Sequence, residues 1–145
     1  MWLKNKVLYL TEKYNTQDPF ELALHLNTSV IKWDLHKEIR GYYKYDRRNK
    51  YIVINDNLEV NMQRVVCAHE LGHAVLHPHA NTPFMKQNTL LSVSRIEREA
   101  NRFAAELLIP DNALRNVFDQ LTMDEIASYH KVPVELVRLK FKELF

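Results

Sequence analysis

The hydrophobic residues at the start of the chain recur at helical spacing. Apolar positions return every three or four residues up to about Tyr14, as in the stripe of an amphipathic helix: Trp2, Leu3, Val7, Leu8 and Leu10. Asp18 and Pro19 then resemble a helix start, with an aspartate cap and a proline at the first helical position, before the segment PFELALHL. The first quarter of the chain is therefore predicted to be helical.

The next part of the chain has the composition of strands. Three segments, SVIKWDL, GYYKYD and KYIVIN, are rich in β-branched and aromatic residues. A polar turn from Asp46 to Asn49 separates the last two, which indicates a hairpin. We expect these segments to form a small antiparallel sheet.

From Asn57 the apolar pattern changes to a helical repeat. Six residues at steps of three and four share one inward face of a helix that ends before Pro78: Leu58, Met62, Val65, His69, His73 and Leu76. Asp56 with Glu59 resembles a capping box at its start. A second long helix is predicted from about Ser94 to Ile109, before Pro110, and the rest of the chain is also helical.

These elements predict an α+β fold. A small antiparallel sheet packs on the helix of residues 57–77 and on the helix that follows it. A chain of 145 residues is long enough to bury a core. We divide it into a core of residues 1–110 and a C-terminal helical subdomain of residues 111–145.

Charge and composition restrict the possible functions. The 20 basic and 18 acidic residues nearly balance, so the chain lacks the strong positive charge of a dedicated nucleic-acid binder. The start, MWLKNKVLYLTEKYN, places charges where a signal peptide needs an apolar run, and no segment resembles a membrane span. The single cysteine, Cys67, fits a reducing compartment. We expect a cytoplasmic protein without a membrane partner.

The segment HELGHAVLH, residues 69–77, carries the main chemical signal. On a helix, His69 and His73 can direct two imidazoles at one ion, and Glu70 can reach a water bound to it. Neutral imidazoles suit Zn²⁺, and a carboxylate that does not bind the metal can serve as a general base. The alternative is a pair of buried structural histidines with a solvated Glu70, but such histidines would need other polar partners.

A catalytic zinc usually has three protein ligands, so a third must come from elsewhere. His79 is one candidate, because the pattern HExxHxxGxxH has a histidine at that distance. Leu76 occupies the place of its glycine, however, and this argues for a different exit from the helix. His77 is better interpreted as a helix-end residue or as one that supports a ligand.

Glu97, in the segment SRIEREANRFAAELLIP, is the better candidate. On a helical projection it falls on the apolar face, whereas Glu99 and Glu106 fall on the opposite, solvated side. A carboxylate turned into a core needs a partner, and a dication is suitable. The alternative is a capping box, in which Glu97 pairs with Ser94 at the helix start. Asn101, one turn beyond Glu97, can accept a hydrogen bond from a ligand histidine.

Together YIVIN, HELGHAVLH and EREANRFAAELLIP, in this order, resemble the ImmA/IrrE family of metallopeptidases over roughly residues 25 to 110. The resemblance implies a gluzincin-like core in which His69, His73 and Glu97 bind Zn²⁺, with Mn²⁺ as the alternative, and Glu70 is the base. It also implies a helix-turn-helix repressor as substrate, whose cleavage relieves repression. LLIP stands where LLMP is frequent in the family, which affects no catalytic residue.

The resemblance also places the strand KYIVIN beside the cleft. Its edge could then pair with an extended substrate, so Tyr51, Val53 and Asn55 are expected to bind substrate.

The tail, LTMDEIASYHKVPVELVRLKFKEL, has the pattern of a helix-turn-helix. Thr122 and Glu125 form a capping box, and a new helix begins at Pro133. Basic residues in the last helix, Lys140 among them, alternate with acidic ones, so helical packing or repressor docking is favoured over DNA binding.

Two functions are therefore expected for the chain: a zinc endopeptidase acting on a repressor, or a non-hydrolytic regulator that binds a repressor or DNA through the same fold or tail.

Overall fold

The computed structural model describes residues 2–81, 85–86, 94–111 and 121–144. Its first two helices are those that the apolar spacing predicts: α1, Trp2–Tyr14, and α2, Pro19–His25. Asp18 caps α2, because its Oδ1 accepts a hydrogen bond of 3.0 Å from the backbone N–H of Phe20. Both helices contribute to the main hydrophobic core, α1 through Leu3, Val7 and Leu10, and α2 through Leu22 and Ala23.

The sheet has the order β1-β3-β2-β4, with strands Thr28–Trp33 (β1), Ile39–Asp46 (β2), Asn49–Asn55 (β3) and Met85–Lys86 (β4). The β2–β3 hairpin is antiparallel, and its turn residues Arg47 and Arg48 have the positive φ angles typical of tight hairpin turns. The sheet is not purely antiparallel, however, since β1 and β3 are parallel. The chain reverses from β1 into β2 and again into β3, and β3 then inserts between the two earlier strands.

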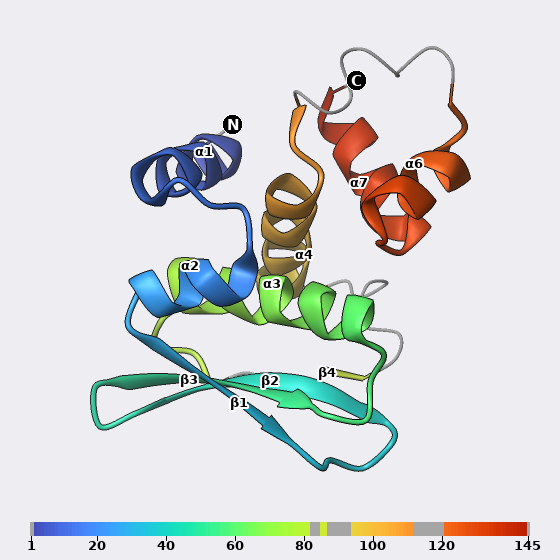
Figure 1. Cartoon of the computed structure of the whole chain (residues 1–145). Coiled ribbons are helices and arrows are strands. Elements are labelled where there is room, and N and C mark those ends of the chain that lie inside the picture. Colours follow the sequence, from blue (N-terminus) through green and yellow to red (C-terminus); the bar gives the residue numbers. More distant parts are fainter. Residues whose placement is uncertain (1, 82–84, 87–93, 112–120, 145) are drawn as a thin grey trace.

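Helices cover one face of this sheet (Figure 1). Helix α3, Val60–Leu76, lies directly on the strands, and α4, Arg95–Leu108, packs on α3. Tyr43, Ile52 and Ile54 are fully buried between the sheet and the helices. The predicted α+β class, with a small sheet packed on the histidine-bearing helix, is confirmed.

The start of α3 differs from the expected capping box. Glu59 occupies the N-cap position and its side chain makes no capping hydrogen bond. The preceding turn is instead closed by Asn55, whose Oδ1 accepts a 3.0 Å hydrogen bond from the backbone N–H of Asn57. The Gln63 side chain donates to the carbonyl of Leu58 at 2.9 Å. The amide side chains of Asn55 and Gln63 therefore satisfy this turn, and no Asp56–Glu59 box is needed.

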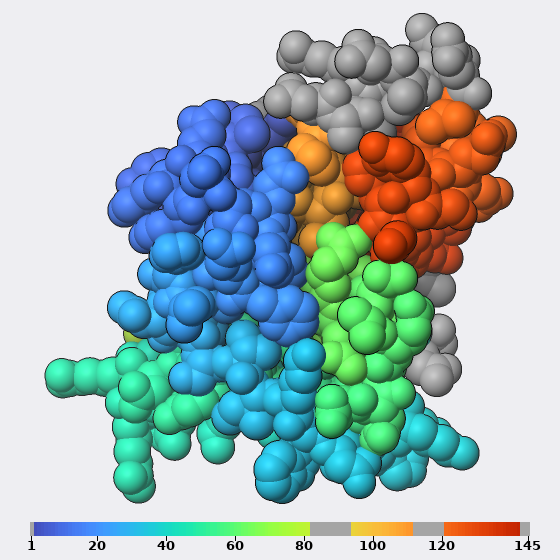
Figure 2. Space-filling model, in the orientation of Figure 1, coloured from blue at the N-terminus to red at the C-terminus, as the bar shows by residue number. Residues whose placement is uncertain are grey.

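The tail forms two helices, α6, Met123–His130, and α7, Val134–Leu144. The predicted capping box is confirmed, since Thr122 Oγ1 accepts from the Glu125 N–H and Glu125 Oε1 accepts from the Thr122 N–H, both at 3.1 Å. In Figures 1 and 2 helix α1 and the C-terminal helices lie on opposite sides of α4. The division into a 1–110 core and a 111–145 subdomain remains a prediction.

A buried ion cluster attaches α7 to α4. Lys140 Nζ lies 2.5 Å from Glu106 Oε2 and 2.6 Å from Asp111 Oδ1, and Lys4 of α1 also contacts Asp111. Lys140 is only 1% exposed, so it is not available to a DNA surface. Glu106, expected on the solvated side of its helix, is buried as well, because α7 covers that side. No helix within the described ranges is long and apolar enough to cross a membrane.

Candidate metal centre

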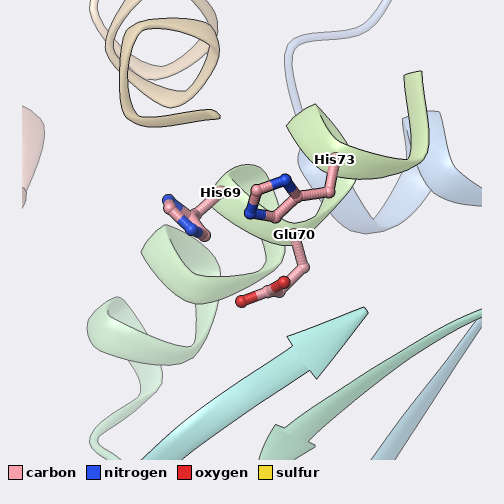
Figure 3. A group of neighbouring side chains, drawn as sticks. All are labelled: His69, Glu70 and His73. Atoms are coloured by element: carbon pink, nitrogen blue, oxygen red, sulfur yellow. The ribbon is translucent and has the colours of Figure 1, made fainter. Parts of the chain in front are cut away.

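Three polar side chains of α3 meet inside the protein. His69, Glu70 and His73 are each at most 1% exposed, and one potential ligand atom from each lies within 4.8 Å of the others (Figure 3). Residues four positions apart on a helix share one face, which brings the two imidazoles together. The Glu70 carboxylate lies on the side of α3 that faces the strands (Figure 3). The alternative interpretation, in which the two histidines are structural and Glu70 is solvated, does not agree with the burial of Glu70.

Helix α4 adds a second carboxylate to the same place. Glu97 Oε2 lies 2.6 Å from His73 Nε2, and Glu97 Oε1 lies 3.4 Å from His69 Nε2. The alternative role of Glu97, in a capping box, is not observed: Ser94 is the N-cap residue of α4, but its side chain makes no capping hydrogen bond. The structure thus joins His69, His73 and Glu97, which come from two helices.

Gly72, which lies between the two histidines, permits this approach of α4 to α3. A Cβ atom at Gly72 would lie 3.0 Å from Phe103 Cβ and 3.1 Å from Ala100 Cα, closer than ordinary van der Waals contact. The missing side chain therefore sets the distance between the helices that carry the candidate ligands. No role for Gly72 was predicted from its sequence position. A glycine inside a helix is nevertheless a signal of close packing, because glycine lowers helix stability.

The electrostatics of the metal-free protein reflect burial and mutual contact. Burial raises the pKa of Glu70 to about 7; the charge of His69 opposes this shift and that of Glu97 reinforces it. Burial lowers the pKa of His73 and outweighs the contact with Glu97. For Glu97, burial acts to raise the pKa, but the contacts with His69 and His73 outweigh burial and hold it well below its usual range. Glu97 is therefore ionised and able to bind a cation at neutral pH.

The polar atoms at this centre fit a metal ion. Four of them are buried and, apart from the ion pairs of Glu97 with the two histidines, have no hydrogen-bond partner among the described residues: His69 Nε2, His73 Nε2, Glu97 Oε2 and Glu70 Oε1. Buried polar atoms in proteins are nearly always paired, so four such atoms in one cluster require an explanation. Two imidazole nitrogens and a carboxylate are a ligand set that zinc prefers. A cation between His69, His73 and Glu97 would satisfy three of these atoms.

Other polar groups contact the far nitrogens of both histidines. Asn101 Oδ1 lies 2.7 Å from His69 Nδ1, and His77 Nδ1 lies 3.1 Å from His73 Nδ1. His77 Nε2 in turn lies 2.8 Å from Glu99 Oε1. The expectation of a solvated Glu99 is thus corrected, since its carboxylate pairs with His77. The helical projection missed this contact because the partner belongs to another helix.

His79 lies apart from the cluster. Its ring packs edge-on against Tyr45 of β2, with 4.7 Å between ring centroids, and the residue is exposed. Among the described residues, the group able to hold a metal is formed by His69, Glu70 and His73, without His79. The alternative ligand set with His79 gains no support from the structure.

The three residues expected to bind substrate lie in β3, which is an interior strand. It pairs with β1 on one side and β2 on the other, so its edge is not free and the expected pairing with an added strand is wrong, whereas substrate binding by these three residues stays a prediction. Tyr51 and Val53 alternate with Ile52 and Ile54, which face α3, and so lie on the opposite face of the sheet. Asn55 is buried, and its Nδ2 donates to the carbonyl of Ile39 at 2.8 Å. Strand order depends on the tertiary fold, which the local pattern of KYIVIN does not encode.

Comparison with known proteins agrees with this geometry. The IrrE N-terminal-like domain of the peptidase M78 family matches residues 23–142. The chain is 55% identical over 139 residues to uncharacterized immunity region protein 2 of Bacillus phage phi105, covering 95% of this chain and 88% of the relative. It is 26% identical over 145 residues to metallopeptidase ImmA of Bacillus subtilis (strain 168), covering 98% and 85%. With its histidines and glutamates gathered at one buried centre, the chain belongs to the ImmA/IrrE family of metallopeptidases.

Proposed function

We propose that this protein is a zinc-dependent endopeptidase that cleaves a helix-turn-helix transcriptional repressor and so relieves repression. The observation that carries the proposal is the cluster of buried polar atoms that His69, Glu70, His73 and Glu97 bring together at one place. Membership of a metallopeptidase family supports the reaction class.

In this proposal His69, His73 and Glu97 hold the metal through Nε2, Nε2 and the carboxylate. Mn²⁺ could occupy the same ligands, but two imidazoles favour zinc. When bound, zinc supplies a Lewis acid that polarises the scissile carbonyl and acidifies a water. The transfer of the proton from this water depends on a side chain of the protein that does not bind the metal.

Glu70 is the group that moves the proton. Its Oε1 is buried and has no hydrogen-bond partner in the part of the chain that the structure describes, so the atom can accept a proton from the attacking water. Held on the rigid helix α3 beside the ligands, the same carboxyl group can then deliver this proton to the nitrogen of the leaving amine. Burial raises the pKa of Glu70, which makes the carboxylate a stronger base than an exposed glutamate.

The repressor as substrate rests on family resemblance. The name of the phage relative refers to an immunity region, which is consistent with control of a phage repressor. A transcriptional repressor is a cytoplasmic protein, so the proposal places this peptidase in the cytoplasm too. Direct DNA binding by the tail is not part of the proposal, because Lys140 is buried against Glu106 and Asp111.

The test is to incubate the zinc-loaded protein with the repressor encoded beside it and to detect fragments by mass spectrometry. The parent should produce two fragments, and Glu70→Gln should slow cleavage by at least the roughly 10²- to 10⁴-fold of general acid–base catalysis. Glu59→Gln, an exposed glutamate before the same helix, is the matched control and should cleave normally. If Glu70→Gln relieves repression in cells without fragments, the protein is instead a non-hydrolytic regulator that binds the repressor.

A further inference from the structure

The imidazole of His73 is the first of four side chains in a continuous line of contacts that leads away from the candidate metal centre. His73 Nδ1 lies 3.1 Å from His77 Nδ1, and His77 Nε2 lies 2.8 Å from Glu99 Oε1. Beyond it, Arg95 Nε lies 3.5 Å from Glu99 Oε2, and the Arg95 side chain is 83% exposed. The line therefore joins a fully buried histidine to the protein surface.

We propose that His77 and Glu99 are positioning residues that hold the metal-binding tautomer of His73; this inference rests on the metal site of the proposed function. A carboxylate only accepts hydrogen bonds, so Glu99 requires a proton on His77 Nε2. In neutral His77 the Nδ1 atom is then an acceptor, and His73 must donate from Nδ1. This leaves the lone pair of His73 Nε2 directed at the metal.

The other ligand histidine receives the same tautomer from a different group. The carbonyl oxygen of Asn101 accepts from His69 Nδ1 at 2.7 Å, which leaves His69 Nε2 without a proton. The Asn101 amide oxygen fixes the tautomer of His69 directly. The Glu99 carboxylate fixes the tautomer of His73 indirectly, through the imidazole of His77. Such outer hydrogen bonds orient ligand rings and increase their basicity.

The position of His77 in the backbone supports this role. It is the C-cap residue of α3, and its N–H donates to the carbonyl of His73 at 2.8 Å. The side chain of His77 is 11% exposed and that of Glu99 19% exposed, so both groups are largely sheltered from water. The fixed backbone and the sheltered pair allow the contacts to be present before any metal binds.

The zinc affinity of the 145-residue chain, measured with Zn²⁺ alone against a chelating indicator, tests the proposal. His77→Phe should weaken affinity by about 10- to 100-fold, the usual effect of losing an outer hydrogen bond. His77→Asn should stay close to the parent, because its amide oxygen can replace Nδ1 as the acceptor. Arg95→Ala is the control and should bind zinc as the parent does, since it leaves the His77–Glu99 contact in place.

Glu99→Ala tests whether the carboxylate acts through His77. In the parent background it should weaken zinc binding about tenfold, but combined with His77→Asn it should have no further effect. An equal loss in both backgrounds would mean that Glu99 is only structural. Parental affinity in His77→Phe would equally overturn the proposal.

Nitrogen NMR of the zinc-loaded protein with ¹⁵N-labelled histidine gives a readout that simple loss of packing does not change. In the parent His77 should carry its proton on Nε2, and in Glu99→Ala it should become a mixture of both tautomers. A proton on His77 Nδ1 in the parent overturns the proposal.

The two proposals can fail separately. A parent that binds zinc but leaves the repressor intact contradicts the peptidase function, while the affinities and tautomers still decide the role of His77 and Glu99. A parent that cleaves the repressor, with every variant at parental zinc affinity, contradicts only the positioning role. A parent that binds no zinc contradicts both.

Discussion

Glu97 Oε2 on α4 lies 2.6 Å from His73 Nε2 on α3, and within the described parts of the chain neither atom has a hydrogen-bond partner beyond this contact. The contact brings an anionic oxygen and an imidazole nitrogen together at the junction of two helices. Glu97 Oε1 faces the second imidazole, His69, at 3.4 Å. In the proposed function this relationship completes a three-ligand site. Three predictions concern this centre, and a fourth concerns the ion cluster that attaches α7.

Replacement of Glu97 should remove most of the zinc affinity. Glu97→Ala deletes one of three proposed ligands, so the loss should exceed the roughly 10- to 100-fold typical of an outer hydrogen bond. Isothermal titration with Zn²⁺ measures it. His79→Ala is the control, and it should bind zinc normally because His79 packs on Tyr45. Zinc loss in His79→Ala together with normal binding in Glu97→Ala would reverse the ligand assignment.

The stability of the metal-free protein should depend on pH through Glu70. Burial raises the pKa of Glu70 from its ordinary 4.5 to about 7 in the folded state, so folding takes up a proton between these values. This group therefore destabilises the fold increasingly as pH rises through that window, by about 3 kcal/mol above pH 7. Glu70→Gln should remove this cost.

Urea unfolding without metal measures the effect. Glu70→Gln should be more stable than the parent at pH 8, and the difference should disappear below about pH 4.5, where Glu70 is protonated in both states. A constant difference at all pH values would show that the effect is not ionisation of Glu70. Glu59→Gln, at an exposed position, should follow the parent throughout.

Gly72→Ala should weaken zinc binding although alanine favours helices by about 1 kcal/mol. The new Cβ would meet Phe103 Cβ at 3.0 Å and the backbone of Ala100 at 3.1 Å, so α4 must move away and carry Glu97 with it. Zinc titration and thermal unfolding of the metal-free variant measure the two effects separately. Unchanged zinc affinity with a higher melting temperature would show that the helices do not need this close contact.

Lys140→Met should destabilise the protein by about 3 kcal/mol, because it leaves the buried carboxylate of Glu106 without its cation. Lys142→Met, at an exposed position of the same helix, should have little effect. Urea unfolding of both variants provides the comparison. Equal stabilities would mean that α7 is held by its apolar contacts alone.

Local sequence carries much of this structure. Helices α1 to α4, the hairpin and the tail follow from apolar spacing, capping residues and turn residues, because these signals act within a few positions of the chain. The two histidines and Glu70 are also local, since residues of one helical turn point the same way whatever surrounds the helix. The family could be recognised for the same reason: its motifs are short segments within single elements.

Contacts between elements were decided only by the tertiary structure. The insertion of β3 between β1 and β2 removed the edge expected for substrate, and the packing of α7 buried Lys140 and Glu106, which the helical pattern placed in solvent. The pairing of Glu99 with His77 likewise joins two helices. Periodicity reports which face of an element is apolar, but it does not report which element covers that face. By itself the sequence therefore determined the elements and the chemistry of the metal-binding motif, whereas the packing of those elements decided which charges are buried and which strands are free.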